Sequence, residues 1–169
     1  MRAVHYTGAG ALEVADVEDR PPGAGQVTVD VAYTGICGTG LHVLHGEMDA
    51  RVRTPAVLGH EMSGRVRSVG AGVTGWAAGD PVTVMPLRWC GSCPACRRGF
   101  SHVCQRLDFV GIDSPGSLQE RWTVPAELLV RLQPGGWFSG ILAGWLTDGF
   151  EGAQVVVRGP MGAFGVHEN

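Results

Sequence analysis

Four of the five cysteines lie close together in the chain, between positions 90 and 104. They are Cys90, Cys93, Cys96 and Cys104, and their spacing is C-x2-C-x2-C-x7-C. Four thiolates brought together by short knuckles can complete the tetrahedral coordination of Zn²⁺, which leaves no open position for chemistry. The spacing therefore predicts a structural zinc site, and loss of one cysteine should unfold the lobe that carries it.

Other interpretations of this cysteine cluster are an iron–sulfur centre and four unmetallated thiols. The bacterial ferredoxin pattern has three residues before its last cysteine and a proline after it, and this chain has neither. A disulfide framework would be expected of a secreted protein rather than an intracellular one. Zinc is the interpretation that the spacing favours.

A second set of metal-binding residue types is spread more widely along the chain. Cys37 stands in the segment TGICGT, and His60 and Glu61 stand together in LGHE. A thiolate, an imidazole and a carboxylate could share one metal ion. From spacing alone, a packed cysteine and histidine without metal is the alternative, and it stays open.

The elements that must position these residues are mostly strands. Residues 26–31 alternate polar and apolar side chains at a period of two, as in a half-buried strand, and four further segments have a similar character: 2–6, 11–17, 64–69 and 81–85. The 27 glycines and 10 prolines lie between these runs and suit tight turns. A β-barrel or sandwich is predicted, with short helical turns at 39–45 and after Pro125.

Composition and charge limit the classes of partner that the protein is expected to bind. The 169 residues are 44% hydrophobic and 17% charged, with a net charge of −3, which is typical of a globular domain. The basic residues do not form a cluster, so binding to nucleic acid or anionic lipid is not expected. The apolar stretch 137–146 is shorter than the roughly 20 residues that cross a bilayer, and the N-terminus has no apolar leader. We expect a cytoplasmic protein with a small-molecule substrate.

Several motifs occur in a fixed order along the chain: GICGT, LHVLHG, VLGHEMSGRV, GDPVTV, CGSCPACRRG with a trailing cysteine, and GSLQERWTVP. In this order they resemble the zinc-dependent medium-chain alcohol and polyol dehydrogenases, threonine and glucose dehydrogenases included. The resemblance covers residues 1–132 and implies a mainly β fold, a GroES-like, partly open β-barrel. The cysteine lobe, residues 88–106, would be an excursion from that barrel.

The resemblance also implies roles for residues that match the family's motifs. Cys37 and His60 match the ligands of the catalytic zinc, and Glu61 matches the neighbouring carboxylate that can coordinate it. Thr39 matches the hydroxyl that hydrogen-bonds the substrate alcohol, and His42 matches the outer proton relay. The implied reaction is oxidation of a secondary alcohol through a zinc-bound alkoxide, with hydride transfer to NAD(P). Without the resemblance, Thr39 would be read as a helix cap and His42 as a solvated side chain.

Two features depart from the family's pattern. Gly40 stands where the family usually has an aspartate that orients the histidine ligand, and losses of this kind typically cost 10- to 100-fold in metal affinity or activity. The stretch after residue 132 is also short, so the usual third zinc ligand has no clear counterpart. Asp148 or Glu151 could substitute for it.

The segment 155–165 resembles the first strand and glycine turn of a dinucleotide-binding fold. Its candidate nucleotide-binding residues are Gly159, Gly162 and Gly165. In the G-x-G-x-x-G register that ends at Gly165, however, Pro160 stands at the position of the first glycine. The helix and the acidic residue that a Rossmann site needs do not follow. We therefore interpret residues 133–169 as a shortened connector with a vestigial nucleotide-binding strand, and expect this chain alone not to bind NAD(P) tightly.

Two functions from different classes follow. The first is an alcohol or polyol dehydrogenase-like domain whose redox activity needs a nicotinamide-binding partner. The alternative is a zinc protein without a Rossmann domain, repurposed as a non-redox enzyme or as a module that forms a homodimer. The dimer would use a segment with helix-like apolar spacing, which contains Trp137, Phe138, Ile141, Leu142, Trp145 and Leu146.

Overall fold

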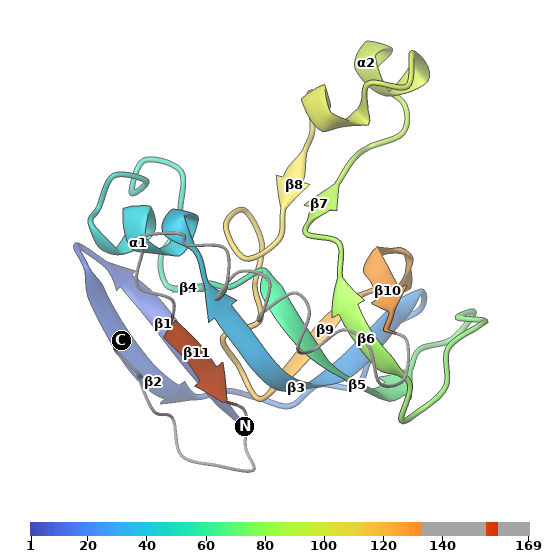
Figure 1. The fold of residues 1–169 in the computed structure, drawn as a ribbon, viewed down its shortest axis with the longest axis horizontal. Helices are drawn as coiled ribbons and strands as arrows, with labels where there is room; N and C mark the ends of the chain where they lie inside the picture. The colour runs from blue at the N-terminus through green and yellow to red at the C-terminus, as the bar shows by residue number, and fades with distance from the viewer. Residues whose placement is uncertain (133–154, 159–169) are drawn as a thin grey trace, which may run out of the picture.

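The computed structural model describes residues 1–132 and the backbone of one later strand, Val155–Arg158. Most of this part of the chain is β-structure, as predicted (Figure 1). The barrel strands are β1 (Arg2–Gly8), β2 (Ala11–Asp16), β3 (Gln26–Ile36), β4 (Ala56–Val57), β5 (Glu61–Val69), β6 (Pro81–Val84), β9 (Arg121–Pro125), β10 (Leu129–Arg131) and β11 (Val155–Arg158).

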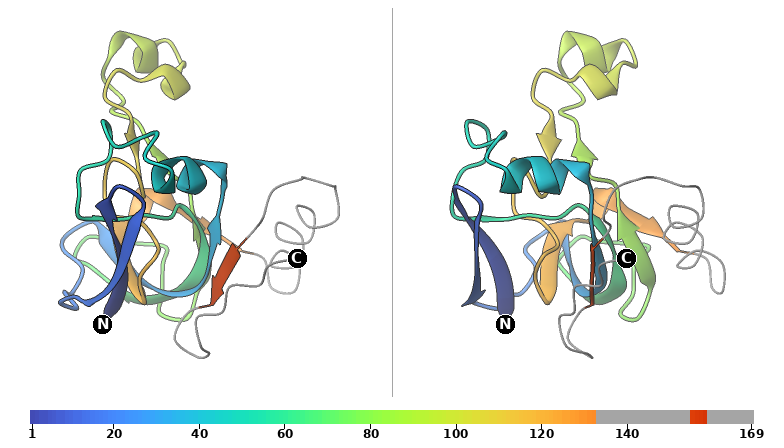
Figure 2. Two further views of the ribbon diagram at one scale, coloured as in Figure 1. Left: turned by 90° about the vertical axis from the view of Figure 1, so that its left-hand side faces the viewer. Right: turned by 60° about the vertical axis from the view of Figure 1, so that its left-hand side comes forward.

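Strand β3 organises the larger sheet. It pairs antiparallel with β5 along one edge, while β9 and β11 pair with its first and second halves. Beyond β5 the sheet continues through β6 to β10, and it curls into an open barrel (Figure 2). A smaller sheet has the order β2-β1-β4, and a bridge between Ala3 and Gln119 ties it to the segment before β9.

The strands predicted from the sequence are present, but β3 is longer and more buried than its alternation indicated. Thr28 has a polar side chain and was expected to face solvent, yet it is 2% exposed. Its hydroxyl lies 2.8 Å from that of Thr123 on β9. Pairing two hydroxyls satisfies both groups and makes burial of the threonine tolerable.

Two apolar clusters hold the barrel together. The larger surrounds Trp122, which is 1% exposed and donates its indole N–H to the carbonyl of Pro115 at 2.9 Å. The smaller packs α1 (Gly38–Leu44) onto the barrel and consists of Tyr6, Val43, Val52, Leu58 and Ile112. The helix that carries Thr39 and His42 is therefore fixed by its buried Val43.

The cysteine lobe stands away from the barrel on a narrow stalk (Figures 1 and 2). The stalk is a two-stranded ladder of β7 (Leu87–Arg88) and β8 (Asp108–Phe109). At its tip lie α2 (Pro94–Arg97) and the 3₁₀ turn η1 (Ser101–Val103). Because neither apolar cluster includes a residue of this tip, its folding depends on the cysteines themselves.

The two predicted helical turns lie in the described part of the chain, whereas several other predictions concern residues outside it. The predicted turn at 39–45 is α1, and the one after Pro125 is the 3₁₀ turn η2 (Ala126–Leu128). No helix in the described residues has the length and apolar character needed to span a bilayer. Positions 133–154 and 159–169 lie outside the described residues, and with them the six residues of the expected dimer segment, Asp148, Glu151, Gly159, Gly162 and Gly165.

Candidate metal centres

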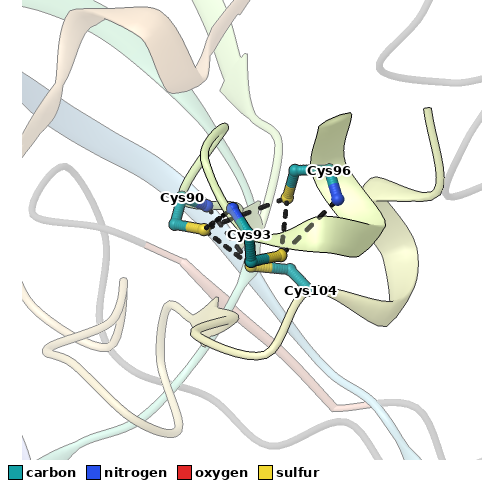
Figure 3. Close-up of side chains that lie close together, drawn as sticks. All are labelled: Cys90, Cys93, Cys96 and Cys104. Atoms are coloured by element: carbon teal, nitrogen blue, oxygen red, sulfur yellow. Dashed lines mark hydrogen bonds between the residues drawn. The ribbon is translucent and has the colours of Figure 1, made fainter. Parts of the chain in front are cut away.

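The four lobe cysteines converge on one point (Figure 3). The Sγ of Cys93 lies 3.4 Å from that of Cys96 and 4.0 Å from that of Cys104. The Sγ of Cys90 lies 4.0 Å from that of Cys96 and 3.5 Å from that of Cys104. All four are free thiols, and these separations are far longer than a disulfide bond of about 2.05 Å.

These separations fit a tetrahedral zinc site. Four sulfurs placed about 2.3 Å from a central Zn²⁺ lie about 3.8 Å from one another, and the observed values of 3.4 to 4.0 Å surround that figure. The donor set closes the coordination sphere, since no fifth ligand group joins the cluster among the described residues. A metal here would be structural.

Backbone N–H groups point at the lobe sulfurs and favour their thiolate forms. The N–H of Cys93 donates to Cys90 Sγ at 3.4 Å, and the N–H of Cys96 donates to Cys93 Sγ at 3.5 Å. The backbone N–H of Ser92 is the main cause that lowers the pKa of Cys90 to about 5. Burial among the other sulfurs raises the pKa of Cys96 to about 12, so full ionisation of the cluster requires a cation.

Arg106 is a cation in contact with this cluster. Its guanidinium donates to Ser92 Oγ at 2.6 Å, and its backbone N–H donates to Cys104 Sγ at 3.3 Å. A hydrogen bond to the Cys90 sulfur raises the pKa of Arg106. The side chain therefore offsets part of the negative charge that four thiolates place at the tip of the lobe.

The second centre is formed where β3 ends and β5 begins. Cys37 follows the last residue of β3, and His60 precedes Glu61, the first residue of β5. Gly35 pairs with Glu61 in the antiparallel register, so the two strand ends are neighbours. One ligand atom from each of Cys37, His60 and Glu61 lies within 4.8 Å of the others.

Glycines make room for this centre. A Cβ at Gly35 would stand 2.9 Å from the Glu61 carboxylate, so a larger residue there would push that carboxylate out of its present position. Gly59 has a φ of +96°, and a Cβ there would stand 2.8 Å from Ser117 Oγ. The peptide that leads into His60 thus has a backbone conformation and a packing that exclude other residues.

Cys37 and His60 are in direct contact. Cys37 Sγ lies 3.2 Å from His60 Nε2. Burial raises the pKa of the Cys37 thiol, but hydrogen bonds from His60, the Gly40 backbone and the Thr39 hydroxyl lower it more, to a net value of about 7. A half-buried cysteine is therefore ionised in part near neutral pH, as a metal ligand must be.

The other side of the His60 ring is less well held. Phe109 packs against the ring with centroids 4.5 Å apart. The buried Nδ1 has no hydrogen-bond partner within residues 1–132. A buried imidazole nitrogen without a partner is uncommon, and metal-bound histidines almost always donate this N–H to an acceptor. Gly40, which lines one pocket together with His60, offers no side chain to accept it.

The three residues fit an open zinc site. A sulfur, an imidazole nitrogen and a carboxylate oxygen are a suitable set of three protein ligands, with a fourth position left for substrate or water. For tetrahedral zinc, the sulfur and nitrogen ligands would be about 3.6 Å apart, and the observed 3.2 Å is close to this. Only a small adjustment of the side chains is needed.

An apolar cavity of about 40 Å³, which opens to solvent, adjoins this centre. Its lining residues are Leu12, Gly35, Ile36, Cys37, Gly40, Leu44, Leu58, Gly59, His60, Ile112 and Leu118. Cys37 and His60 are its polar members, so the metal-binding side chains face a space that is otherwise apolar. Such a setting strengthens electrostatic interactions between a bound metal and a substrate oxygen.

Thr39 and His42 both lie on α1, three positions apart and thus on neighbouring turns of one face. The Thr39 hydroxyl lies close enough to the Cys37 thiol to help lower its pKa. His42 is exposed, and its Nδ1 lies 2.6 Å from Glu47 Oε2. Thr39 is therefore at the centre itself, whereas His42 lies toward solvent with a carboxylate partner.

Sequence reasoning did not identify three residues at these centres. Glu47 contacts His42, Phe109 packs on His60, and Arg106 contacts the lobe. Phe109 reaches His60 from a strand 49 positions away, which no local pattern reveals. Arg106 has a sequence signal, because a cation two positions after a clustered cysteine is well placed to offset thiolate charge.

Comparison with known proteins finds relatives that are named as dehydrogenases. The family described as the alcohol dehydrogenase GroES-like domain matches residues 23–134. The 2-dehydro-3-deoxy-L-galactonate 5-dehydrogenase of Pseudoalteromonas atlantica is 48% identical over 135 residues, which are 80% of this chain and 40% of that protein. The L-threonine 3-dehydrogenase of Pyrococcus horikoshii is 42% identical over 130 residues, 75% of this chain and 37% of that protein.

A solved structure shares the fold. The crystal structure of galactitol-1-phosphate dehydrogenase from Escherichia coli superposes with a TM-score of 0.74 at 32% identity, over 80% of this chain and 39% of that one. The chain thus spans about 40% of the length of the curated relatives it matches.

Proposed function

Because the chain belongs to the alcohol dehydrogenase GroES-like domain family, among the zinc-type medium-chain dehydrogenases, we propose that it holds the metal and the alcohol in an NAD(P)-dependent oxidation. The substrate would be a secondary alcohol or polyol. The observation that carries the proposal is the contact of 3.2 Å between Cys37 Sγ and His60 Nε2, with the Glu61 carboxylate beside it and an apolar cavity in front.

The residues at this centre would divide the work. Cys37, His60 and Glu61 would hold a zinc ion, which when bound acts as a Lewis acid toward the hydroxyl oxygen of the alcohol. Thr39, next to the sulfur ligand, would hydrogen-bond that hydroxyl and orient it. The leucine and isoleucine side chains of the cavity would exclude water from the reacting carbon. NAD(P) would take the hydride.

The lobe would serve this centre indirectly. A zinc held by Cys90, Cys93, Cys96 and Cys104 would fix the tip of the stalk, and the stalk carries Phe109, which packs on His60. Folding of the lobe and orientation of the histidine ligand are therefore linked through β8. A closed thiolate site contributes its binding free energy directly to folding.

Metal content tests this proposal on the purified protein. Elemental analysis should give two zinc ions per chain, falling to one in Cys37→Ser while the lobe retains its own. Replacement of zinc by Co²⁺ provides a second readout, because visible absorption of the open site should change when a secondary alcohol is added. One zinc in both proteins would contradict the proposal.

One observation favours a second candidate, a zinc protein without hydride transfer. Within the described residues, His60 Nδ1 has no hydrogen-bond partner and Gly40 supplies none, which indicates a weaker metal site than the family's usual arrangement. The two candidates differ in an assay of the chain with a nicotinamide-binding domain supplied in trans, NAD(P)⁺ and a panel of secondary alcohols and polyols. Reduced nicotinamide that disappears in Cys37→Ser supports the dehydrogenase, and two bound zinc ions with no reduction across the panel support the alternative.

A further inference from the structure

His42 and Glu47 form a fixed pair at the outer end of α1. His42 Nδ1 lies 2.6 Å from Glu47 Oε2. The backbone supports the same arrangement, since the N–H of Glu47 donates to the carbonyl of His42 at 3.0 Å. The contact therefore joins a helix residue to the turn that follows it, and it does not depend on two long side chains meeting by chance.

The pair lies at the solvent end of a series of polar groups that begins at the metal centre. Cys37 is half-buried, Thr39 bonds to its sulfur, and His42 follows Thr39 by one helical turn. The His42 side chain is 60% exposed and that of Glu47 57%. Exposure thus increases from Cys37 and Thr39, which are partly buried, to His42 and Glu47, which are exposed.

A carboxylate on Nδ1 decides which nitrogen of a neutral imidazole can accept a proton. The carboxylate accepts the Nδ1–H, and the lone pair is then on Nε2. Free histidine prefers the opposite tautomer, with the hydrogen on Nε2. Glu47 therefore selects the form of His42 whose Nε2 is a base.

We propose that Glu47 is the positioning residue of a proton exit, holding His42 as the base that receives the proton released from the alcohol. The inference rests on the proposed function. In the oxidation the C–H bond breaks and its hydride goes to the nicotinamide, while the O–H bond breaks and its proton passes by way of the Thr39 hydroxyl to His42 Nε2. The imidazolium, which is exposed to solvent, then gives its Nε2 proton to water while Glu47 keeps the hydrogen on Nδ1, which restores the starting tautomer. The charges balance, since one hydride and one proton leave the alcohol.

The alternative is an ordinary surface pair. Exposed ion pairs contribute between zero and about 1 kcal/mol to stability, and many contribute nothing measurable. A pair of that kind would leave the tautomer and the catalytic rate unchanged when it is removed. The two interpretations therefore make opposite predictions for variants at position 47.

The test combines nitrogen NMR and kinetics on the whole chain. Long-range ¹H–¹⁵N correlation spectra report the tautomer of each neutral histidine, and the His42 signals are assigned by their loss in His42→Gln. The wild type should show the hydrogen on Nδ1. The share of this tautomer should fall in Glu47→Gln, whose amide accepts weakly, and fall further in Glu47→Leu. Glu127→Leu, an exposed glutamate in η2, is the matched control and should match the wild type.

In the alcohol assay, Glu47→Leu should lower kcat about 10-fold with KM unchanged, because the proton acceptor is misoriented while substrate contacts remain. A wild-type His42 with its hydrogen on Nε2, or equal spectra for the wild type and Glu47→Leu, would overturn the proposal. An unchanged kcat in Glu47→Leu would overturn it too. Failure of the proposed function has a different signature, since it removes the second zinc and all nicotinamide reduction while the His42 spectrum still reports on Glu47.

Discussion

Cys37 Sγ and His60 Nε2 lie 3.2 Å apart although 23 positions separate the two residues in the sequence. The antiparallel register of β3 and β5 closes this separation, because Gly35 pairs with Glu61 and both ligands stand just beyond the paired ends. A one-residue shift of either strand would turn its side chains to the other face of the sheet. The metal centre therefore depends on the register of the barrel as much as on the ligand residues.

The first prediction concerns Gly40→Asp. A Cβ at this position would meet only the Cγ2 of Ile36, at 3.3 Å, which a small movement of that methyl group relieves. A carboxylate there should accept the hydrogen of His60 Nδ1 and tighten zinc at the Cys37 site about 10- to 100-fold. Competition with a zinc chelator measures the affinity. Gly40→Ala removes the glycine without adding an acceptor, and equal affinities for the two variants would refute the expectation.

The second prediction is a pH dependence of stability in the metal-free protein. The pKa of Cys37 is about 7 in the folded state and near 9 in an unfolded chain, so the folded state favours the thiolate. This contribution is complete above about pH 9 and is lost as the pH falls through 7. Because the side chain is only partly buried, the size of this contribution should stay below about 1 kcal/mol.

Urea unfolding of wild type and Cys37→Ser, both stripped of metal, isolates this contribution between pH 6 and 9.5. The four lobe thiols titrate in both proteins and cancel in the difference. The wild type should gain stability relative to the serine variant as the pH rises from 7 to 9. A difference that is constant over this range would show that Cys37 has an ordinary pKa.

Strands β1, β2, β3, β5 and β6 of this barrel could be predicted from sequence because apolar and polar residues alternate with the period of a strand, whereas β4, β9 and β10 were not predicted. The stalk could not, since β7 and β8 are only two residues each and carry no period. The lobe cysteines were identifiable from their short spacing alone. Cys37 and His60 needed the family resemblance, because nothing local to either residue encodes the pairing of β3 with β5.

The third prediction concerns Gly111→Ala. Gly111 has a φ of +85°, and a Cβ there would stand 2.2 Å from the carbonyl oxygen of Gly59, the residue before His60. The substitution should cost about 2–4 kcal/mol in the free energy of unfolding, from the left-handed backbone and the overlap together. It should also displace His60 and remove the zinc of the Cys37 site while the lobe zinc remains.

Gly72→Ala provides the matched control for Gly111→Ala. Gly72 has a similar φ of +78°, but nothing lies within 4 Å of a Cβ placed there. It should therefore show only the backbone cost of about 1–2 kcal/mol and keep both zinc ions. Urea unfolding and elemental analysis measure the two effects. If the two alanine variants lose equal stability and equal metal, the close approach of Gly111 to Gly59 has no role in holding His60.

The fourth prediction concerns Arg106 and the lobe. Arg106 contacts Ser92 Oγ at 2.6 Å, and that hydroxyl lies 3.8 Å from Cys90 Sγ. The arginine side chain therefore both supports the turn between Cys90 and Cys93 (bracing) and offsets thiolate charge. Arg106→Leu should therefore release lobe zinc to a chromogenic chelator about 10-fold faster than the parent protein, since loss of a group that contacts metal ligands typically costs at least this much.

The measurement is made in a Cys37→Ser background, so that only the lobe zinc is counted. Arg98→Leu removes an exposed arginine of the same lobe and should leave the release rate unchanged. Arg106→Lys separates the two roles, because lysine keeps the charge but has no planar fork for Ser92. If charge dominates, lysine restores most of the resistance to release; if bracing dominates, lysine behaves as leucine does. Equal rates for Arg106→Leu and Arg98→Leu would mean that the four thiolates hold the lobe without help from position 106.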